Sequence, residues 1–233
     1  MRWLLSVCLF WIGQHGAAAQ ATGRDTVLLD NSFVFADGLY ASFEALRRNE
    51  PTHRWEEVYA QLFANPQTFV ARLLSLDARD PEAAPVPADS LWGIVLEGIP
   101  YVRVPADAHF GKGTPFVGLK VRGRLAYYTW ESRREEEVEI RAYNPVNGRP
   151  FRTGRVSKEV PVYYEQLLHF ADGRIEPFTI QTVLAAIADD EKLHRTLAEL
   201  PEKEAWDQLY KMLLVFDDRN PFYLVVEQLT AKN

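Results

Sequence analysis

The sequence predicts an α+β protein built on an antiparallel β-meander that is either open or partly closed into a barrel. Alternating strand patterns and hairpin turns fill residues 91–176, and apolar residues at helical spacing fill residues 179–218. Short helices are expected within residues 42–76, followed by a proline-rich linker, 77–89. Strands grouped first and helices later are typical of α+β folds rather than of alternating βαβ units.

Residues 1–19 are expected to be a cleaved secretory signal. Arg2 supplies a positive start, residues 3–13 form an apolar run too short to span a bilayer, and the alanines at 17–19 offer a cleavage site. The mature chain then starts near Gln20 without a transmembrane span, and residues 20–233 are expected to form a single domain. The expected location is the periplasm or the cell envelope.

Charge and cysteine content narrow the possible partners and chemistry. The chain has 26 Lys+Arg against 32 Asp+Glu, a net charge of −6, which argues against a nucleic-acid partner held by its phosphates. The single cysteine, Cys8, lies inside the expected signal. The mature chain would therefore contain no disulfide and no thiol chemistry.

A β-hairpin in residues 91–104 organises the predicted meander. Glu97-Gly98 is the expected two-residue turn, because glycine and turn-forming residues at these positions match the twist of the flanking strands. The expected cross-strand neighbours are Leu96 with Ile99, Ile94 with Tyr101 and Trp92 with Arg103.

Further strands are predicted after this hairpin. A second hairpin is expected to turn at Arg122-Gly123 and to place six residues on one face: Val117, Leu119, Val121, Ala126, Tyr128 and Trp130. Residues 135–143 alternate charged and apolar side chains, which predicts a half-buried strand. Asn147-Gly148 is a turn signal from which residues 150–156 could return as a strand. Residues 160–170 fit either a strand or a helix, with a strand favoured, and Asp172-Gly173 is the next expected turn.

Helices are predicted on both sides of the meander. Before it, Ser42 caps residues 43–49, residues 55–63 have helical spacing, and Asn65 caps a helix with Pro66 at its first position. After it, the expected helices are 179–188, 190–200 capped by Asp189, and 202–216, followed by a last short strand, 222–226.

Candidate catalytic or metal-binding motifs are weak, so no cofactor or metal is expected. The five histidines lack metal-ligand spacing, and the glycines at 111 and 113 do not fit a phosphate-binding loop. His109 lies in the Gly/Pro-rich loop 106–115, where a functional histidine would be least surprising, although an ordinary exposed loop histidine is the favoured interpretation. The glutamates at 135–137 are expected to be a solvated charge run.

Aromatic residues give the remaining candidate surface. Trp92, Tyr101, Tyr127 and Trp130 lie on adjacent predicted strands and, with His109, form the candidate ligand or partner surface. Aromatic side chains on an open sheet face can stack on sugars, peptides or lipids. The favoured alternative is that they form the core beneath the C-terminal helices.

Three motifs occur in order along the chain. They are Asp37-Gly-Leu-Tyr-Ala-Ser-Phe-Glu-Ala-Leu-Arg-Arg-Asn-Glu-Pro51, Trp92-Gly-Ile-Val-Leu-Glu-Gly-Ile-Pro-Tyr101 and Phe216-Asp-Asp-Arg-Asn-Pro-Phe-Tyr223. This series resembles uncharacterised secreted proteins of Gram-negative bacteria, although the helices expected between Thr52 and Leu76 depart from the pattern of that family. The resemblance implies secretion and assigns no activity.

The expected function is a non-catalytic binding or structural module of the cell envelope, whose partner is an envelope protein, glycan or lipid. One alternative is a periplasmic hydrolase with a site built from loops such as 106–115. The other alternative is a carrier of a small hydrophobic ligand, if the meander closes.

Overall fold

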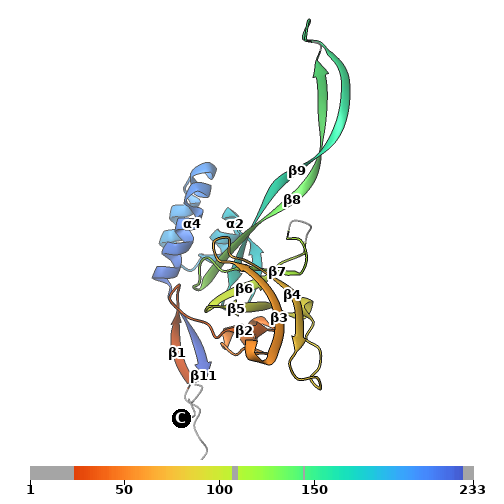
Figure 1. Cartoon of the computed structure of the whole chain (residues 1–233). Helices are drawn as coiled ribbons and strands as arrows, with labels where there is room; N and C mark the ends of the chain where they lie inside the picture. The colour runs from red at the N-terminus through yellow and green to blue at the C-terminus, as the bar shows by residue number, and fades with distance from the viewer. Residues whose placement is uncertain (1–23, 107–109, 144, 228–233) are drawn as a thin grey trace, which may run out of the picture.

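The computed structural model of the protein describes residues 24–106, 110–143 and 145–227. Its antiparallel strands form three sheets and its helices gather mainly at one side, which confirms the α+β prediction in this coarse form (Figure 1). The expected signal, residues 1–19, and His109 lie outside the described residues.

The largest sheet is curved like a half-barrel and has the strand order β2-β5-β6-β7-β4-β3. Its strands are β2 (Gly38–Tyr40), β3 (Val58–Asn65), β4 (Val70–Ala78), β5 (Gly93–Leu96), β6 (Ile99–Arg103) and β7 (Thr114–Gly118). The sheet stays open, since β2 and β3 lie at its two ends and β2 meets the segment before β3 at an isolated bridge between Leu39 and His53.

Two smaller sheets and the helices complete the fold. The second sheet contains β8 (Leu125–Tyr143), β9 (Pro150–His169) and β10 (Ile175–Pro177), and the third pairs β1 (Arg24–Leu29) with β11 (Phe222–Glu227). The helices are α1 (Phe43–Arg47), α2 (Ile180–Ala186), α3 (Glu191–Ala198) and α4 (Glu202–Arg219), with short 3-10 turns at Trp55–Glu57 and Ala88–Ser90. Within the described chain, no helix combines the length and the apolar character needed to cross a membrane.

The predicted β5–β6 hairpin is confirmed, with Leu96 opposite Ile99 and Ile94 opposite Tyr101. Glu97 and Gly98 both have positive φ, 52° and 74°, as the predicted type of turn requires. Both faces of the hairpin are buried. Ile94 and Tyr101 belong to one core cluster, whereas their strand neighbours Val95 and Val102 belong to another.

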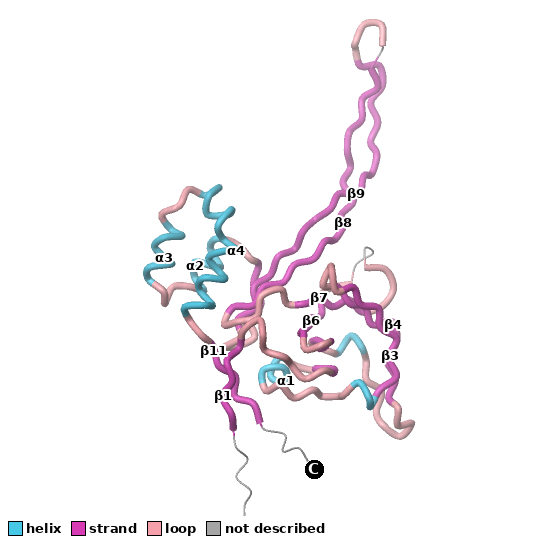
Figure 2. Tube along the Cα trace, turned by 60° about the vertical axis from the view of Figure 1, so that its left-hand side comes forward, coloured by secondary structure: helices cyan, strands magenta, loops and turns pink. Residues whose placement is uncertain are grey.

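The root of the β8–β9 pair lies between the helices and the large sheet (Figure 2). On β8, Tyr127 packs with the helices while its neighbour Tyr128 packs with the large sheet. On β9, Leu167 and Leu168 divide in the same way, and both are fully buried. The two faces of one ladder therefore join two cores.

The predicted helices between Thr52 and Leu76 are wrong, because β3 and β4 form an antiparallel hairpin there. Val58 and Leu62 have helical spacing, but they also fit the alternation of a strand. The Asn65 side chain accepts the backbone N–H of Gln67 at 3.0 Å and so caps a turn rather than a helix. The expected linker is also shorter, since β4 continues to Ala78.

The second predicted hairpin is largely wrong. Strands β7 and β8 belong to different sheets, and the segment between them contacts β8 through an isolated bridge between Val121 and Tyr127. Instead, β8 pairs along its whole length with β9. Five of the six residues expected on one face do share a core cluster, Val117, Leu119, Ala126, Tyr128 and Trp130, but they meet by packing of one sheet on the other.

The C-terminal helices are confirmed with one change at a cap. Asp190, rather than Asp189, caps α3 and accepts the backbone N–H of Leu193 at 3.0 Å. Asp189 forms an ion pair with Arg124 at 2.6 Å instead. The last strand is also confirmed, and its pairing with β1 brings the described ends of the chain together.

Two predicted turns offer a direct test of the packing. Gly148 and Gly173 have similar positive φ values, 66° and 77°, but a Cβ at Gly173 would collide with the buried ring of Phe43, whereas one at Gly148 would meet nothing within 4 Å. We expect Gly173→Ala to lower the free energy of unfolding by about 2–4 kcal/mol and Gly148→Ala by about 1 kcal/mol or less. Chemical denaturation measures both, and equal losses would contradict this packing.

Candidate functional site

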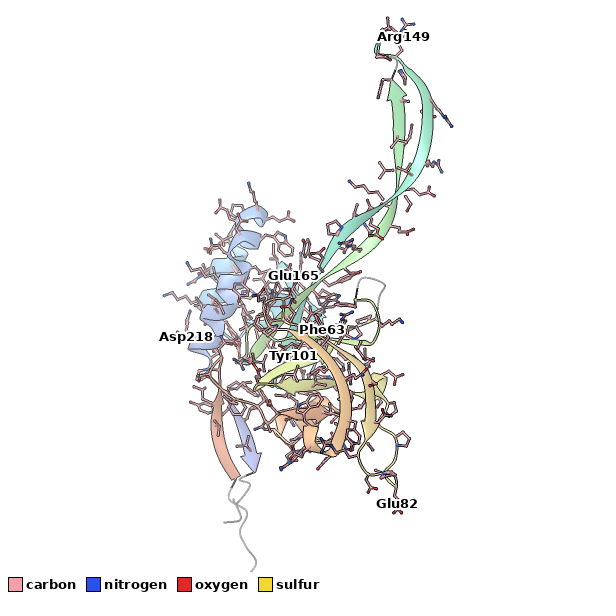
Figure 3. The ribbon with its side chains drawn as sticks, viewed as in Figure 1. Phe63, Glu82, Tyr101, Arg149, Glu165 and Asp218 are labelled. Atoms are coloured by element: carbon pink, nitrogen blue, oxygen red, sulfur yellow. The ribbon has the colours of Figure 1, made fainter. Side chains whose placement is uncertain are left out.

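The outer parts of β8 and β9 leave the body as a long two-stranded projection, here called the arm (residues 131–163). Its pairing runs from Glu131 opposite Tyr163 to Tyr143 opposite Pro150, with a register shift between Ala142 and Tyr143. Figure 3 shows Arg149 at its far end and Glu165 where it joins the body. Within the described chain no third strand pairs with the arm, because β10 pairs with β9 only at Gln166–Leu168 and its partners.

One face of the arm, here called the apolar face, carries its aliphatic side chains. Its cross-strand pairs are Arg134–Val160, Glu136–Lys158, Val138–Val156, Ile140–Gly154 and Ala142–Arg152. Val138, Val156 and Ile140 are 38%, 42% and 50% exposed. Residues 135–143 were predicted to be half-buried, and this prediction is wrong because nothing in the described chain covers their face.

The opposite face, here called the charged face, is held together by ion pairs. Arg133 pairs with Glu159 at 3.1 Å, Arg141 with Glu139 at 3.0 Å and Arg155 with Glu137 at 3.6 Å. Such exposed pairs contribute about 0–1 kcal/mol each. Since an isolated two-stranded ribbon is marginally stable in water, the ion pairs alone do not explain an arm of this length.

Charge is divided unequally between the two faces. The apolar face has three bases (Arg134, Arg152 and Lys158) and one acid (Glu136), a net charge of +2. The charged face has three bases (Arg133, Arg141 and Arg155) and five acids (Glu131, Glu135, Glu137, Glu139 and Glu159), a net charge of −2. The apolar side chains therefore share their face with the surplus of positive charge.

Aromatic packing anchors the arm to the body. The Trp130 ring is stacked with Tyr164 at 5.1 Å and with Tyr128 at 6.0 Å between ring centroids. On the other face of β8, the Tyr127 hydroxyl donates a short hydrogen bond to Glu165. Burial, followed by this contact, raises the pKa of Tyr127, so the phenol stays protonated.

A cleft of about 450 Å³ lies beside this root. Phe63, Phe110, Trp130 and Tyr163 supply aromatic walls, and Arg72, Lys120 and Glu131 supply charges. The Arg72 guanidinium lies over the Phe63 ring at 4.9 Å and donates to the carbonyl of Phe110 at 2.5 Å. These contacts connect the β3–β4 hairpin to the loop before β7 and shape the mouth of the cleft.

The structure does not bring the predicted aromatic surface together. Trp92 packs against Phe43 beside one core cluster, Tyr101 is buried in a second, and Tyr127 is buried in a third. Only Tyr127 lies beneath the C-terminal helices, as the favoured alternative expected of all of them. Trp130 alone reaches a cleft at the arm.

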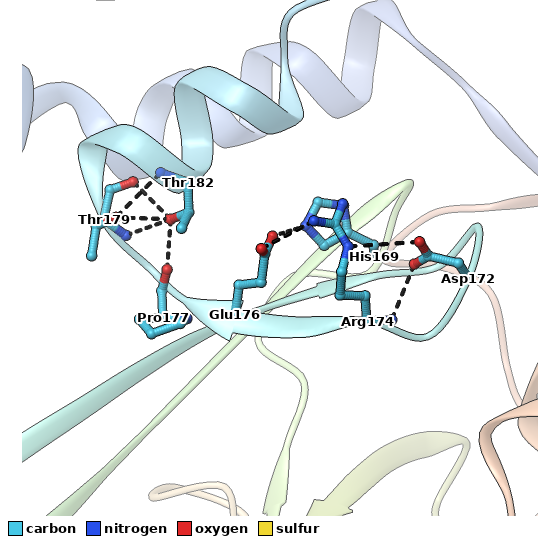
Figure 4. Close-up of polar contacts among 7 residues, drawn as sticks. All are labelled: His169, Asp172, Arg174, Glu176, Pro177, Thr179 and Thr182. Atoms are coloured by element: carbon cyan, nitrogen blue, oxygen red, sulfur yellow. Dashed lines mark hydrogen bonds and ion pairs between the residues drawn. The ribbon is translucent and has the colours of Figure 1, made fainter.

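A buried histidine joins a charge network at the turn between β9 and β10 (Figure 4). His169 Nε2 lies 3.0 Å from Glu176 Oε2, and Arg174 Nη1 lies 3.0 Å from Glu176 Oε1. Burial and the nearby Arg174 lower the pKa of His169, against the opposing effect of Glu176. Asp172 completes the network at 3.6 Å from Arg174. These contacts fix the turn and make His169 a structural residue.

Asp217 on α4 is the most perturbed carboxyl group of the described chain. One oxygen accepts the backbone N–H of Leu125 at 3.0 Å, and the other is buried without a hydrogen-bond partner in the described structure. A Cβ at Gly123 would lie 2.5 Å from this carboxyl carbon, so glycine permits the close approach. Burial raises the pKa of Asp217 to about 7, although the amides of Leu125 and Arg124 oppose that rise. The carboxyl group thus joins α4 to the start of β8.

Among the described residues, no cluster of three or more His, Cys, Asp or Glu side chains could hold a metal ion. The chain matches no family model, no curated protein and no solved structure in the comparisons. The resemblance to uncharacterised secreted proteins stays a prediction.

Sequence reasoning missed the arm as a functional feature. Its signal was present, because apolar residues alternate through 138–142 and again through 156–162. The alternation identified a two-faced strand but did not show whether another element covers the apolar face. Tyr163, which is 67% exposed at the cleft, had no distinguishing pattern around it.

Asp217 gives a pH-dependent prediction. Because its pKa rises from 3.8 in the unfolded chain to about 7, its contribution to stability is present below pH 4 and is lost as pH rises through 7. Asp217→Asn removes this loss. The difference in free energy of unfolding, Asp217→Asn minus wild type, should therefore be larger at pH 8 than at pH 4 by up to about 4 kcal/mol.

Urea denaturation between these pH values measures the effect. Asp218→Asn, at an exposed position of the same helix, is the matched control. A pH-independent difference between Asp217→Asn and the wild type would contradict the burial of the carboxyl group.

Proposed function

We propose that the protein is a non-catalytic binding module of the cell envelope, which engages its partner through the arm. The observation that supports this most directly is the uncovered apolar face of residues 134–142 and 152–160. Apolar surface left in water is costly, and an exposed contiguous patch commonly marks an interaction site.

The root of the arm supports the same function. Trp130, Tyr164 and Tyr128 hold the base of the ladder in a stack, and Leu167 and Leu168 are fully buried there. The root therefore fixes where the arm leaves the body before it meets a partner. Anchoring one end of a binding element lowers the conformational entropy that the element loses on association.

The proposed location rests on the sequence. The charged start, apolar run and alanines of residues 1–19 have the order of a secretory signal. Cleavage after Ala19 would leave every described element intact, because β1 begins at Arg24. Without cysteine, the mature chain would depend on core packing for its stability outside the cytoplasm.

Secretion predicts a defined mature N-terminus. Protein isolated from the envelope fraction of producing cells should begin near Gln20, as determined by intact mass and N-terminal sequencing. A chain that keeps Arg2 and remains in the cytosolic fraction would contradict the proposed location.

The binding function predicts contacts on one face of the arm. A photo-crosslinking amino acid replacing Ile140, on the apolar face, should form adducts with an envelope component in producing cells. The matched control replaces Glu139 on the charged face, whose side chain is 53% exposed, close to the 50% exposure of Ile140. No adduct from position 140, or equal yields from both positions, would contradict binding through the apolar face.

A further inference from the structure

The outer half of the arm carries cations without acidic partners. Within the described chain, Arg149 at the tip and Arg152 and Lys158 on the apolar face form no ion pair, whereas Arg133, Arg141 and Arg155 on the charged face all do. On the apolar face, Arg134 is compensated by Glu136 at 2.5 Å. The uncompensated positive charge thus lies beside the exposed Val138, Ile140 and Val156.

The same charges disfavour a twofold contact with a second copy of the chain. In a twofold contact each surface meets itself, so two apolar faces would bring net charges of +2 together. The strand edges have the same problem: residues 135–140 of β8 contain four glutamates, and residues 149–158 contain four bases and no acid. Like-charged edges repel one another when they pair with themselves.

We propose that the arm lies with its apolar face on an anionic lipid surface. This inference rests on the proposed function and names the partner class. Val138, Ile140 and Val156 would enter the boundary between headgroups and acyl chains, and Arg152 and Lys158 would contact lipid phosphates. Glu135, Glu137 and Glu139 would then face water, because they lie on the opposite face.

The distribution of side chains favours a lipid surface over a pocket on an acidic protein. The ten residues of the apolar face include no aromatic side chain, whereas the energetically dominant residues of protein interfaces are enriched in Trp and Tyr. Short aliphatic side chains can enter a fluid lipid boundary without a shaped pocket.

The charges also set the depth of binding. Glu136 and Lys158 face each other on the apolar face, so the ribbon would remain at the headgroup level rather than cross the bilayer. Electrostatic attraction contributes roughly fivefold in affinity for each base near an anionic surface and weakens with salt.

Vesicle binding tests the inference with the full mature chain. Cosedimentation should show binding to vesicles of phosphatidylglycerol and phosphatidylethanolamine, weaker binding at high salt and little binding to phosphatidylcholine.

Lys158→Gln should weaken binding about fivefold, and Ile140→Ser combined with Val138→Ser should abolish it. Arg155→Gln, three residues along the same strand but on the charged face, is the matched control and should leave binding unchanged. Circular dichroism confirms that each variant is folded.

No binding to anionic vesicles, or equal losses from Lys158→Gln and Arg155→Gln, would overturn the lipid inference. Light scattering that shows a dimer disrupted by Ile140→Ser would also overturn it, in favour of a second copy. If position 140 forms a protein adduct in cells while vesicles do not bind, the lipid inference fails and the proposed binding function stands. If neither occurs, both fail.

Discussion

The pairing of β8 with β9 is the interaction on which the rest of the structure depends. At its root, alternate residues of one ladder supply both cores: Leu167 packs beneath the helices and Leu168 packs against the large sheet. The Asp217 carboxyl group joins α4 to the start of β8, and the His169 network fixes the end of β9. Loss of this ladder would remove a packing surface from both of these cores, and the outer part of the ladder starts from this well-packed root.

The arm continues the same ladder beyond the point where the helices and the large sheet cover it. Near the root, burial on both faces stabilises the strands, whereas beyond Ser132 and Val162 the backbone pairing and a few exposed ion pairs remain. A partner that covers the arm would therefore stabilise it more than it would stabilise the rest of the fold. The unequal charge of its faces then limits which partner fits, because the apolar side and the uncompensated bases coincide.

Local signals predicted the parts of the fold that depend on local geometry. The Glu97-Gly98 turn, the Ser42 cap and the β8–β9 turn could be identified because their backbone requirements are met within a few residues.

The β3–β4 hairpin could not be identified from the sequence, since Val58 and Leu62 satisfy two periodicities and Asn65 can cap either a helix or a turn. The partner of the inner part of β8, residues 125–130, was also missed, because a long-range ladder competed with a short connection at Gly123. Of the candidate residues, Trp130 lies at the arm root. Whether another element covers Ile140 depends on tertiary structure, which strand alternation does not encode.

Hydrogen exchange resolved by residue tests most directly whether the arm is an uncovered extension of a stable root. In the isolated protein, backbone amides of residues 134–142 and 152–160 should exchange rapidly, whereas those of residues 126–130 and 166–168 should be protected close to the global stability. Anionic vesicles should slow exchange in the arm and leave the root unchanged. Arm amides as strongly protected as the root in the isolated protein would contradict the account, because the arm would then be stable without a partner.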